Sequence, residues 1–324
     1  MTTLALAGDT MLGRGVGQEL VQNPRAPLFD EHVVELIASA DACVLNLECC
    51  ISDRGARFPD PRKPFFFRAP PVAAQRLAEL GVSAVTLANN HALDYGIEAL
   101  LDTLAHLEAV GIPVVGAGGD LHAARRAKVI RCGPLRLRLV AFSDHPPEFA
   151  AAPKSPGIAF APLEGGPPDW VHQAARPGAD ADAVLVAPHW GPNMVPGPVD
   201  RVRAAARTLR SAGATLIAGH SAHVFHGAAP GVLFDLGDFL DDYATNRELR
   251  NDLGLLWLVD LDARGPRRIR TLPLALDYCF TRRAAGAEAD AVLRLLRARC
   301  APFGTEVEAA GDLLELRIPD PASA

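Results

Sequence analysis

Residues 82–96 read Val-Ser-Ala-Val-Thr-Leu-Ala-Asn-Asn-His-Ala-Leu-Asp-Tyr-Gly, an apolar run that ends abruptly in two amides and an imidazole. The first seven of these residues are rich in strand formers and predict a buried β-strand. Open α/β sheets place their chemistry at the carboxyl ends of such strands. Asn90 offers an oxygen to a hard cation, and His91 offers a titratable proton. The alternative is a plain strand-to-helix turn in which asparagine caps the next helix.

Four other predicted strands end in the same way. The polar residues at their ends are Asp9; Asn46 and Glu48; His189; and His220 with His223. Strand ends of one sheet converge on a crevice, so we expect these groups to meet Asn89, Asn90 and His91. Two carboxylates, one amide oxygen and three imidazoles suit divalent Mn, Fe or Zn. Because six ligands exceed what one ion takes while keeping an open position, the set favours two ions that share a carboxylate.

Each candidate ligand also has a plainer interpretation. Asp9 can cap a helix, Glu48 can be a surface carboxylate, and His189 beside a tryptophan can be a core histidine with its hydrogen bonds satisfied. Polar residues at five strand ends together favour a metal site over separate packing roles. Four further histidines lack such settings and are predicted to lie on surfaces: His106, His122, His172 and His226.

The order of predicted elements indicates an α/β fold. Strands and helices alternate as far as residue 218, and mostly strands follow from residue 232. Helices are predicted over residues 199–211 and 287–300, and a long surface loop over residues 145–168. An alternating half followed by a mostly β half suggests two sheets packed in layers, with helices outside.

The composition of the 324 residues limits the function classes. A net charge of −6 argues against a nucleic-acid binder that relies on a basic surface. Six cysteines without a CxxC pair favour free thiols in a reducing compartment. The N-terminal apolar run is too short for a signal peptide, and no later run is long enough to span a membrane. We therefore expect a soluble cytoplasmic protein, and the sequence leaves its oligomeric state open.

Several motifs, in this order, carry a family resemblance. They are Gly8-Asp9-Thr10-Met11, Asn46-Leu47-Glu48, residues 89–96, His189-Trp190-Gly191, residues 219–224 and Leu236-Gly237-Asp238-Phe239. This series resembles the CapA family of bacterial poly-γ-glutamate capsule synthesis, a branch of the calcineurin-like metallophosphoesterases. The resemblance implies a four-layer α/β/β/α sandwich and a single domain over residues 1–324. The core motifs would occupy residues 3–240, with mostly β-structure and one helix in residues 241–318.

The resemblance also implies roles for the candidate residues. Asp9 and His223 would hold one metal ion, Glu48 would bridge, and the second ion would be held by Asn90, His189 and His220. His91 would be the acid that protonates the leaving oxygen.

The chain departs from the superfamily pattern at three places. Met11 stands where the superfamily usually has histidine, Glu48 stands where it usually has aspartate, and one extra residue separates His220 from His223. The first ion therefore has one imidazole fewer.

Other residues suit an anionic substrate. Arg14 and Arg68 carry guanidinium groups that bind phosphate or carboxylate in pairs of hydrogen bonds, and Asn89 lies beside the candidate ligands. Either arginine can equally be an ordinary surface residue. Asp94 either orients His91 as its catalytic partner or caps the helix that starts near Gly96.

Three functions follow as hypotheses. The first is a metal-dependent hydrolase of a phosphate ester that uses a metal-activated water, with one or two Mn, Fe or Zn ions. The second is an accessory or ligase-type enzyme in the synthesis of poly-γ-glutamate or a similar amide polymer, although no GxxxxGK[ST] loop is present. The third is a non-catalytic protein that binds a metal or ligand. In each case the partner is a small or polymeric molecule with an anionic group.

Overall fold

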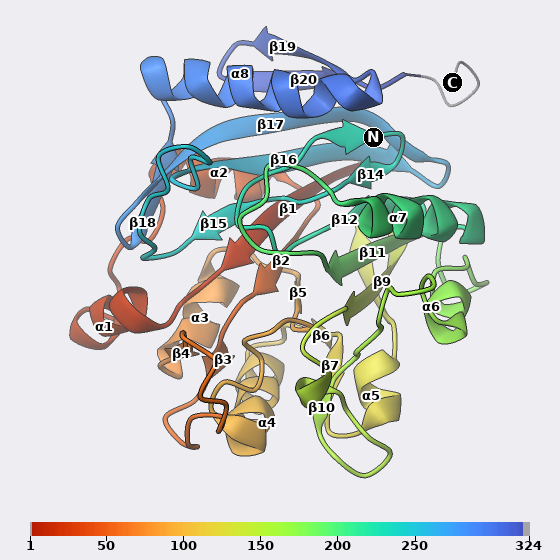
Figure 1. The fold of residues 1–324 in the computed structure, drawn as a ribbon. Helices are drawn as coiled ribbons and strands as arrows, with labels where there is room; N and C mark the ends of the chain where they lie inside the picture. Colours follow the sequence, from red (N-terminus) through yellow and green to blue (C-terminus); the bar gives the residue numbers. More distant parts are fainter. Residues whose placement is uncertain (1, 320–324) are drawn as a thin grey trace.

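The computed structural model describes residues 2–319 and contains two large sheets (Figure 1). The first has ten strands, in the order β19-β20-β17-β16-β1-β2-β5-β6, with β15 beside β1 and β18 beside β17. Its strands are β1 (Thr2–Thr10), β2 (Ala42–Leu47), β5 (Ala84–Thr86), β6 (Val114–Val115), β15 (Asp238–Leu240), β16 (Leu253–Asp262), β17 (Gly265–Asp277), β18 (Phe280–Arg283), β19 (Glu306–Ala310) and β20 (Leu313–Arg317).

The second large sheet has six strands, in the order β13-β14-β12-β11-β9-β8. Its strands are β8 (Lys128–Cys132), β9 (Leu135–Ser143), β11 (Ala183–His189), β12 (Leu216–Ala218), β13 (Ala228–Ala229) and β14 (Val232–Leu233). Two small sheets pair β3 (Cys50–Ile51) with β4 (Arg68–Ala69) and β7 (Ala117–Gly118) with β10 (Gly157–Ile158).

Helices cover the outer faces of both large sheets. The ten-stranded sheet is covered by α1 (Arg14–Gln22), α2 (Glu31–Ser39), α3 (Val72–Glu79) and α4 (Gly96–Ala109). The six-stranded sheet is covered by α5 (Leu121–Arg125), α6 (Asp169–Ala174) and α7 (Asp200–Ala212). The last helix, α8 (Ala287–Cys300), packs against β16, β17 and β19 beside the second sheet, and single turns of 3₁₀-helix occupy Pro147–Phe149 and Ala301–Phe303.

The side chains of each strand alternate between two hydrophobic layers, as the two-residue repeat of a strand requires. In β16, Leu255 and Trp257 pack between the sheets, whereas Leu256 and Leu258 pack toward the outer helices. In β11, Leu185 likewise faces the other sheet, and Val184 and Val186 face α7 and its neighbours. Three apolar layers therefore separate four layers of secondary structure, which confirms the α/β/β/α sandwich.

Local predictions agree with the structure where the apolar period is strong. The predicted helices at residues 199–211 and 287–300 correspond to α7 and α8. The helices α1, α5 and α6 were not predicted, because α5 and α6 span only five and six residues and α1 contains two glycines. The prediction of a surface loop over residues 145–168 is wrong in part, since Phe149 and Ile158 are buried and β10 pairs with β7. Prolines and alanines hide the apolar pattern there.

The direction of the strands sets where polar side chains gather. In the first sheet β1, β2, β5 and β15 run parallel, and in the second sheet β9, β11, β12 and β14 do so. Parallel strands end at the same edge of a sheet, so their carboxyl-end residues become neighbours. Within residues 2–319, no helix has both the length and the apolar character needed to cross a bilayer.

Candidate metal centre

Oxygen donors at the centre come from the ten-stranded sheet. Asp9 lies near the end of β1, Glu48 directly follows β2, and Asp238 begins β15. Asp9 is paired in register with Asp238 on one side and with Asn46 on the other. The three acids are almost fully buried, at 1%, 0% and 1% exposure for Asp9, Glu48 and Asp238. Buried carboxylates at neighbouring positions repel one another, so this edge of the sheet requires positive charge.

Imidazoles come from the six-stranded sheet and the turn after it. His189 is the last residue of β11, and His220 follows β12 by two residues. The two form a parallel bridge with each other, so their side chains lie at one level. His223 follows in the same turn, where Ser221 and His223 have backbone φ angles of 114° and 59°. Backbone strain of this kind in residues other than glycine collects at functional sites.

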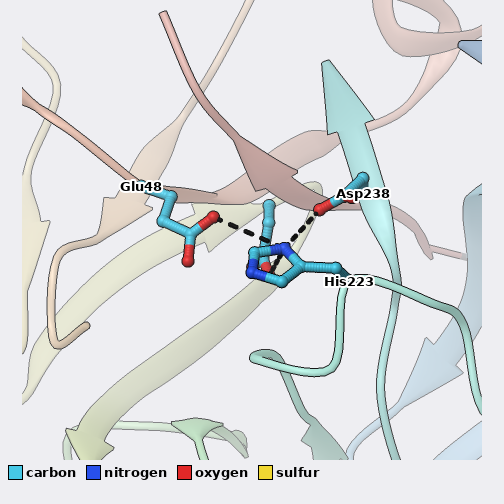
Figure 2. Close-up of side chains that lie close together, drawn as sticks. Glu48, His223 and Asp238 are labelled. Carbon is cyan, nitrogen blue, oxygen red and sulfur yellow. Dashed lines mark hydrogen bonds and ion pairs between the residues drawn. The ribbon is translucent and has the colours of Figure 1, made fainter. Parts of the chain in front are cut away.

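The two groups meet at close range. Nδ1 of His220 lies 3.2 Å from Oδ1 of Asp9, and Nε2 of His189 lies 3.9 Å from Oε1 of Glu48. His223 lies between the acids: its Nδ1 is 2.9 Å from Oδ1 of Asp238 and 3.8 Å from Oε2 of Glu48 (Figure 2). Five predicted ligands, Asp9, Glu48, His189, His220 and His223, are therefore brought together.

Several buried donor atoms in this cluster lack a hydrogen-bond partner among the described residues. They are Oε1 of Glu48, Oδ2 of Asp238 and both ring nitrogens of His189. Oδ1 of Asn90, next to His91 in the sequence, is also buried without such a partner. Leaving a buried polar atom unsatisfied costs about 1–3 kcal/mol, and native proteins do so rarely. Oxygen and imidazole donors of this kind are what divalent metal ions bind, so the residues fit such an ion.

The electrostatics of the cluster lead to the same conclusion. Burial and the charge of Asp9 raise the pKa of Glu48 well above its usual value, and burial and the charge of Asp241 do the same for the pKa of Asp238. Burial also raises the pKa of Asp9, but the contact with His220 and the charges of His220, His189 and His223 together outweigh burial and lower that pKa below its usual value. Burial lowers the pKa of His223, yet the charges of Glu48, Asp9 and two further acids together outweigh it, so the net shift is upward. Acids that resist ionisation when alone are stabilised by a bound cation.

His91 is held by Asp94. Nδ1 of His91 lies 2.6 Å from Oδ2 of Asp94, which also accepts the backbone N–H of Phe67 at 2.6 Å. Nζ of Lys63 forms an ion pair with the other carboxylate oxygen at 2.9 Å, and the Phe67 ring stacks on the imidazole. Helix α4 has no side-chain N-cap, so Asp94 orients His91 and does not cap α4. Burial lowers the pKa of His91 to about 4, although Asp94 opposes the shift.

The amides of residues 89 and 90 have different surroundings. The Asn89 side chain is fully buried and donates to Oδ1 of Asn46 and to the carbonyl of Leu47 at 2.7 Å, while its oxygen accepts the N–H of His91. The protein itself therefore uses this amide, which is not open to a substrate. The side-chain oxygen of Asn90 is unsatisfied, whereas its backbone carbonyl accepts Lys63 at 2.7 Å.

Arg14 and Arg68, the two arginines predicted to bind an anion, line one cavity of about 540 Å³ together with Arg57, Phe66 and Tyr95. Arg14 forms an ion pair with Asp242 at 2.9 Å, so its charge is largely neutralised. Arg68 stacks over Tyr95 and donates to the carbonyl of Arg54 at 3.1 Å. Arg68 is therefore freer than Arg14 to meet an anion.

Sequence reasoning missed four residues at or beside the centre. Asp238 was noted only as part of a motif, and Tyr243, whose hydroxyl lies 3.4 Å from Oε2 of Glu48, was not considered. Asp144 and His145 follow β9, and the His145 ring lies 5.2 Å from that of His189. Their position after a predicted strand was the available signal.

The surface position predicted for His226 is wrong. His226 is buried with 4% exposure, and its Nε2 donates to the carbonyl of Val195. It follows the turn that carries His220 and His223, and that turn packs inward.

A buried acid and a glycine fix the local backbone. Asp235 accepts the N–H groups of Ala222 and Gly237, both at 2.9 Å, and so connects the histidine turn to β15. Gly8 packs so closely that a Cβ there would lie 1.7 Å from the carbonyl oxygen of Gly237. Because only glycine allows this approach, Asp9 and Asp238 can lie on adjacent strands.

Comparison with known proteins identifies relatives over most of the chain. The profile of the family described as "Bacterial capsule synthesis protein PGA_cap" matches residues 3–243. A "Probable polyglutamine synthesis accessory protein" of Mycobacterium tuberculosis is 32% identical over 98% of this chain and 96% of its own length. The "PGA biosynthesis protein CapA" of Bacillus subtilis is 27% identical over 75% of this chain and 64% of its own length.

Among solved structures, one described as a novel phosphatase from Mycoplasma pneumoniae superposes with a TM-score of 0.50. It is 13% identical and covers 85% of this chain and 93% of its own. This likeness concerns the fold alone.

Proposed function

Because the chain belongs to the bacterial capsule synthesis protein family PGA_cap, we propose that it is a divalent-metal-dependent hydrolase of the calcineurin-like phosphoesterase type that acts on a phosphate ester. One observation carries the proposal: unsatisfied, buried oxygen and nitrogen donors from both sheets point into one cluster. Packing alone gives no reason to bury so many unsatisfied groups together.

Within this proposal, the ligands divide between two ions. Asp9 and His223 would hold one ion, His189, His220 and Asn90 would hold the other, and Glu48 would be shared by both. Glu48 faces histidines of both sets, since its two oxygens lie 3.9 Å from His189 and 3.8 Å from His223. Asp9 does so as well, at 3.2 Å from His220 and 3.6 Å from His223. Bound ions of this kind polarise phosphoryl oxygens and lower the pKa of an attacking water. Mn, Fe and Zn all suit the mixed ligand set.

His91 is the group proposed to protonate the leaving oxygen. Asp94 holds its Nδ1 side, so the opposite ring nitrogen is the one that transfers the proton. Burial lowers the pKa of His91 to about 4, so the imidazole is neutral at pH 7 without substrate. A bound phosphate anion would raise this pKa, because a nearby negative charge favours the protonated imidazole. Proton transfer therefore depends on the bound substrate.

We assign the arginine-lined cavity to the anionic part of the substrate. Arg68 and Arg57 line it, and Phe66 and Tyr95 supply aromatic faces. Arg14 holds Asp242, and Asn89 holds the loop of His91, so we give both a positioning role. A small molecule or a polymer with a phosphate or carboxylate group fits this lining.

A second candidate function is an accessory role in the synthesis of an amide polymer. The M. tuberculosis relative that matches nearly the whole chain is named as a probable polyglutamine synthesis accessory protein. In that case the same centre would bind an anionic chain and its metal without cleaving a phosphate ester.

We also place the protein in the cytoplasm. All six cysteines are free thiols, and five of them are buried. Free thiols are usual in a reducing compartment.

The test combines metal analysis with a substrate screen. Purified protein is analysed for bound metal, reloaded with Mn, Fe or Zn, and assayed on phosphomonoesters and phosphodiesters. His91→Ala should lower turnover about 10²- to 10⁴-fold while metal content stays unchanged. His122→Ala, at an exposed histidine on α5, is the matched control.

The outcomes separate the candidates. Turnover that rises with metal content and falls in His91→Ala supports the hydrolase. Full turnover in His91→Ala contradicts the role of His91. Stoichiometric metal with no turnover on any ester contradicts hydrolysis and favours the accessory role.

A further inference from the structure

We infer that Asp238 is itself a metal ligand, that it replaces the imidazole missing at Met11, and that it makes the first ion's site selective for a hard ion such as Mn²⁺ over Zn²⁺. This inference rests on the proposed function, because it assumes that a divalent ion occupies the centre. It concerns a residue outside the ligand set predicted from the sequence.

The position of Asp238 is that of a ligand. It begins β15, lies opposite Asp9 on the adjacent strand and is 1% exposed. One carboxylate oxygen lies 2.9 Å from Nδ1 of His223, and the other has no hydrogen-bond donor among residues 2–319. The carboxyl group of Asp241 is a close neighbour of this carboxylate and adds a further acid to the cluster. Figure 2 shows both Asp238 and Glu48 directed toward His223. A fully buried carboxylate oxygen without a donor is expected where a cation completes its coordination.

Met11 cannot supply the missing ligand. Its side chain is fully buried and belongs to the apolar layer between the ten-stranded sheet and its outer helices, together with Leu12 and Val16. Its sulfur accepts the N–H of Gly13 at 3.0 Å. The position that usually carries the superfamily's first histidine therefore contributes to packing here.

The remaining donors form a compact set. Four buried residues each contribute one ligand atom, and these atoms all lie within 4.8 Å of one another: Asp9, Glu48, His223 and Asp238. Within the described part of the chain, the ion pairs of these three acids are with histidines and not with lysine or arginine. Three carboxylates with no Lys or Arg partner in that region leave excess negative charge for a cation to neutralise.

The two ion sites consequently differ in chemistry. The site with Asp238 has three carboxylates and one imidazole. The other has the imidazoles of His189 and His220, the amide oxygen of Asn90 and the shared Glu48. Oxygen-rich sites favour Mn²⁺ or Mg²⁺, whereas imidazole suits Zn²⁺ and Fe²⁺. Having Asp238 in place of the superfamily's histidine as a ligand of the first ion therefore changes which metal this site retains.

Asp238→Asn tests the inference, because it keeps the shape and removes the charge. Wild type and variant are stripped with chelator, titrated calorimetrically with Mn²⁺ and with Zn²⁺, and analysed for metal content after dialysis. We expect about a 10- to 100-fold loss of Mn²⁺ affinity at one site, with little loss of Zn²⁺ at the other. Asp260→Asn is the control: it removes the charge of another buried acid, 6% exposed, that contacts Arg270 and Thr3 away from the centre.

A second variant, Asp238→His, distinguishes the loss of a metal ligand from a folding defect. It restores an imidazole, so bound Zn²⁺ should rise relative to Mn²⁺, and a far-ultraviolet spectrum and melting curve verify folding. If folded Asp238→Asn binds Mn²⁺ like wild type, or Asp238→His leaves the metal ratio unchanged, the inference is overturned and the proposed function stands. If wild type itself binds no divalent metal, the proposed function fails as well.

Discussion

The oxygen donors of the candidate centre belong to the ten-stranded sheet, whereas its imidazoles belong to the six-stranded sheet and the turn after β12. Asp9, Glu48 and Asp238 sit at the edge formed by β1, β2 and β15, and His189 and His220 sit at the edge formed by β11 and β12. We call these the oxygen side and the nitrogen side. On each side, some buried polar atoms have no hydrogen-bond partner among the described residues.

This centre is a property of the interface between the two sheets. The oxygen side carries like charges that repel one another, and the nitrogen side carries His189, whose two ring nitrogens have no hydrogen-bond partner in the described part of the chain. His223 crosses from one side to the other and lies between Glu48 and Asp238. Packing the two sheets face to face therefore brings together complementary ligands that neither sheet could use by itself.

Removing the residue shared by both sides should have the largest effect. Glu48→Gln removes the charge that faces His189 and His223, so we expect both ions to bind at least about 100-fold more weakly, with turnover lost in proportion. In metal-free protein the melting temperature should not fall, because burial and Asp9 already raise the pKa of Glu48 and disfavour its charged form. Metal titration and calorimetric melting measure the two quantities.

The control for Glu48→Gln is Glu315→Gln on β20, which loses an ion pair with Arg268 away from the centre. A Glu48→Gln protein that keeps both ions would show that the two sides do not share this carboxylate. A metal-free variant that melts well below wild type would show a structural role instead.

Removing one ligand of the nitrogen side should have a smaller effect. His189→Ala should weaken one ion about 10- to 100-fold and leave the ion at Asp9, Glu48 and Asp238 in place. Elemental analysis should then give about one ion fewer per chain than wild type. Loss of all metal would mean that the two sides form a single site whose ions cannot be removed separately. His122→Ala is the control for removing a histidine elsewhere in the protein.

The smallest effect concerns a histidine outside the centre. Burial lowers the pKa of His226 to about 4, so the unfolded chain binds a proton before the folded one does as pH falls. The stability due to this group is therefore complete above about pH 6.5 and is lost progressively toward pH 4, by roughly 1 kcal/mol at pH 5.5.

His226→Gln tests this account. The variant should lose less stability than wild type between pH 7 and pH 5.5, measured by urea unfolding of metal-free protein. Equal acid sensitivity in both proteins would assign the pH dependence to the ligand histidines instead.

Several features of the centre could be predicted from local sequence. Asp9, Glu48, His189, His220 and His223 each follow an apolar run that forms a strand, and polar residues at strand ends are visible without a structure. Asp238 was harder to find, because β15 has only three residues and the acid comes at its start. Asp144 and His145 followed a strand that was predicted, but their place beside His189 depends on the pairing of β9 with β11.

The sequence by itself determined the kinds of ligand and the strand ends that carry them, because side-chain chemistry and the apolar repeat are local properties. Only the tertiary structure decided that Asp238 lies opposite Asp9, that Met11 packs into the core and that His226 is buried. These outcomes depend on contacts between segments far apart in the sequence, such as that of Asp9 with Ser221, 212 residues later. Strand pairing and sheet packing set those distances, and no local pattern encodes them.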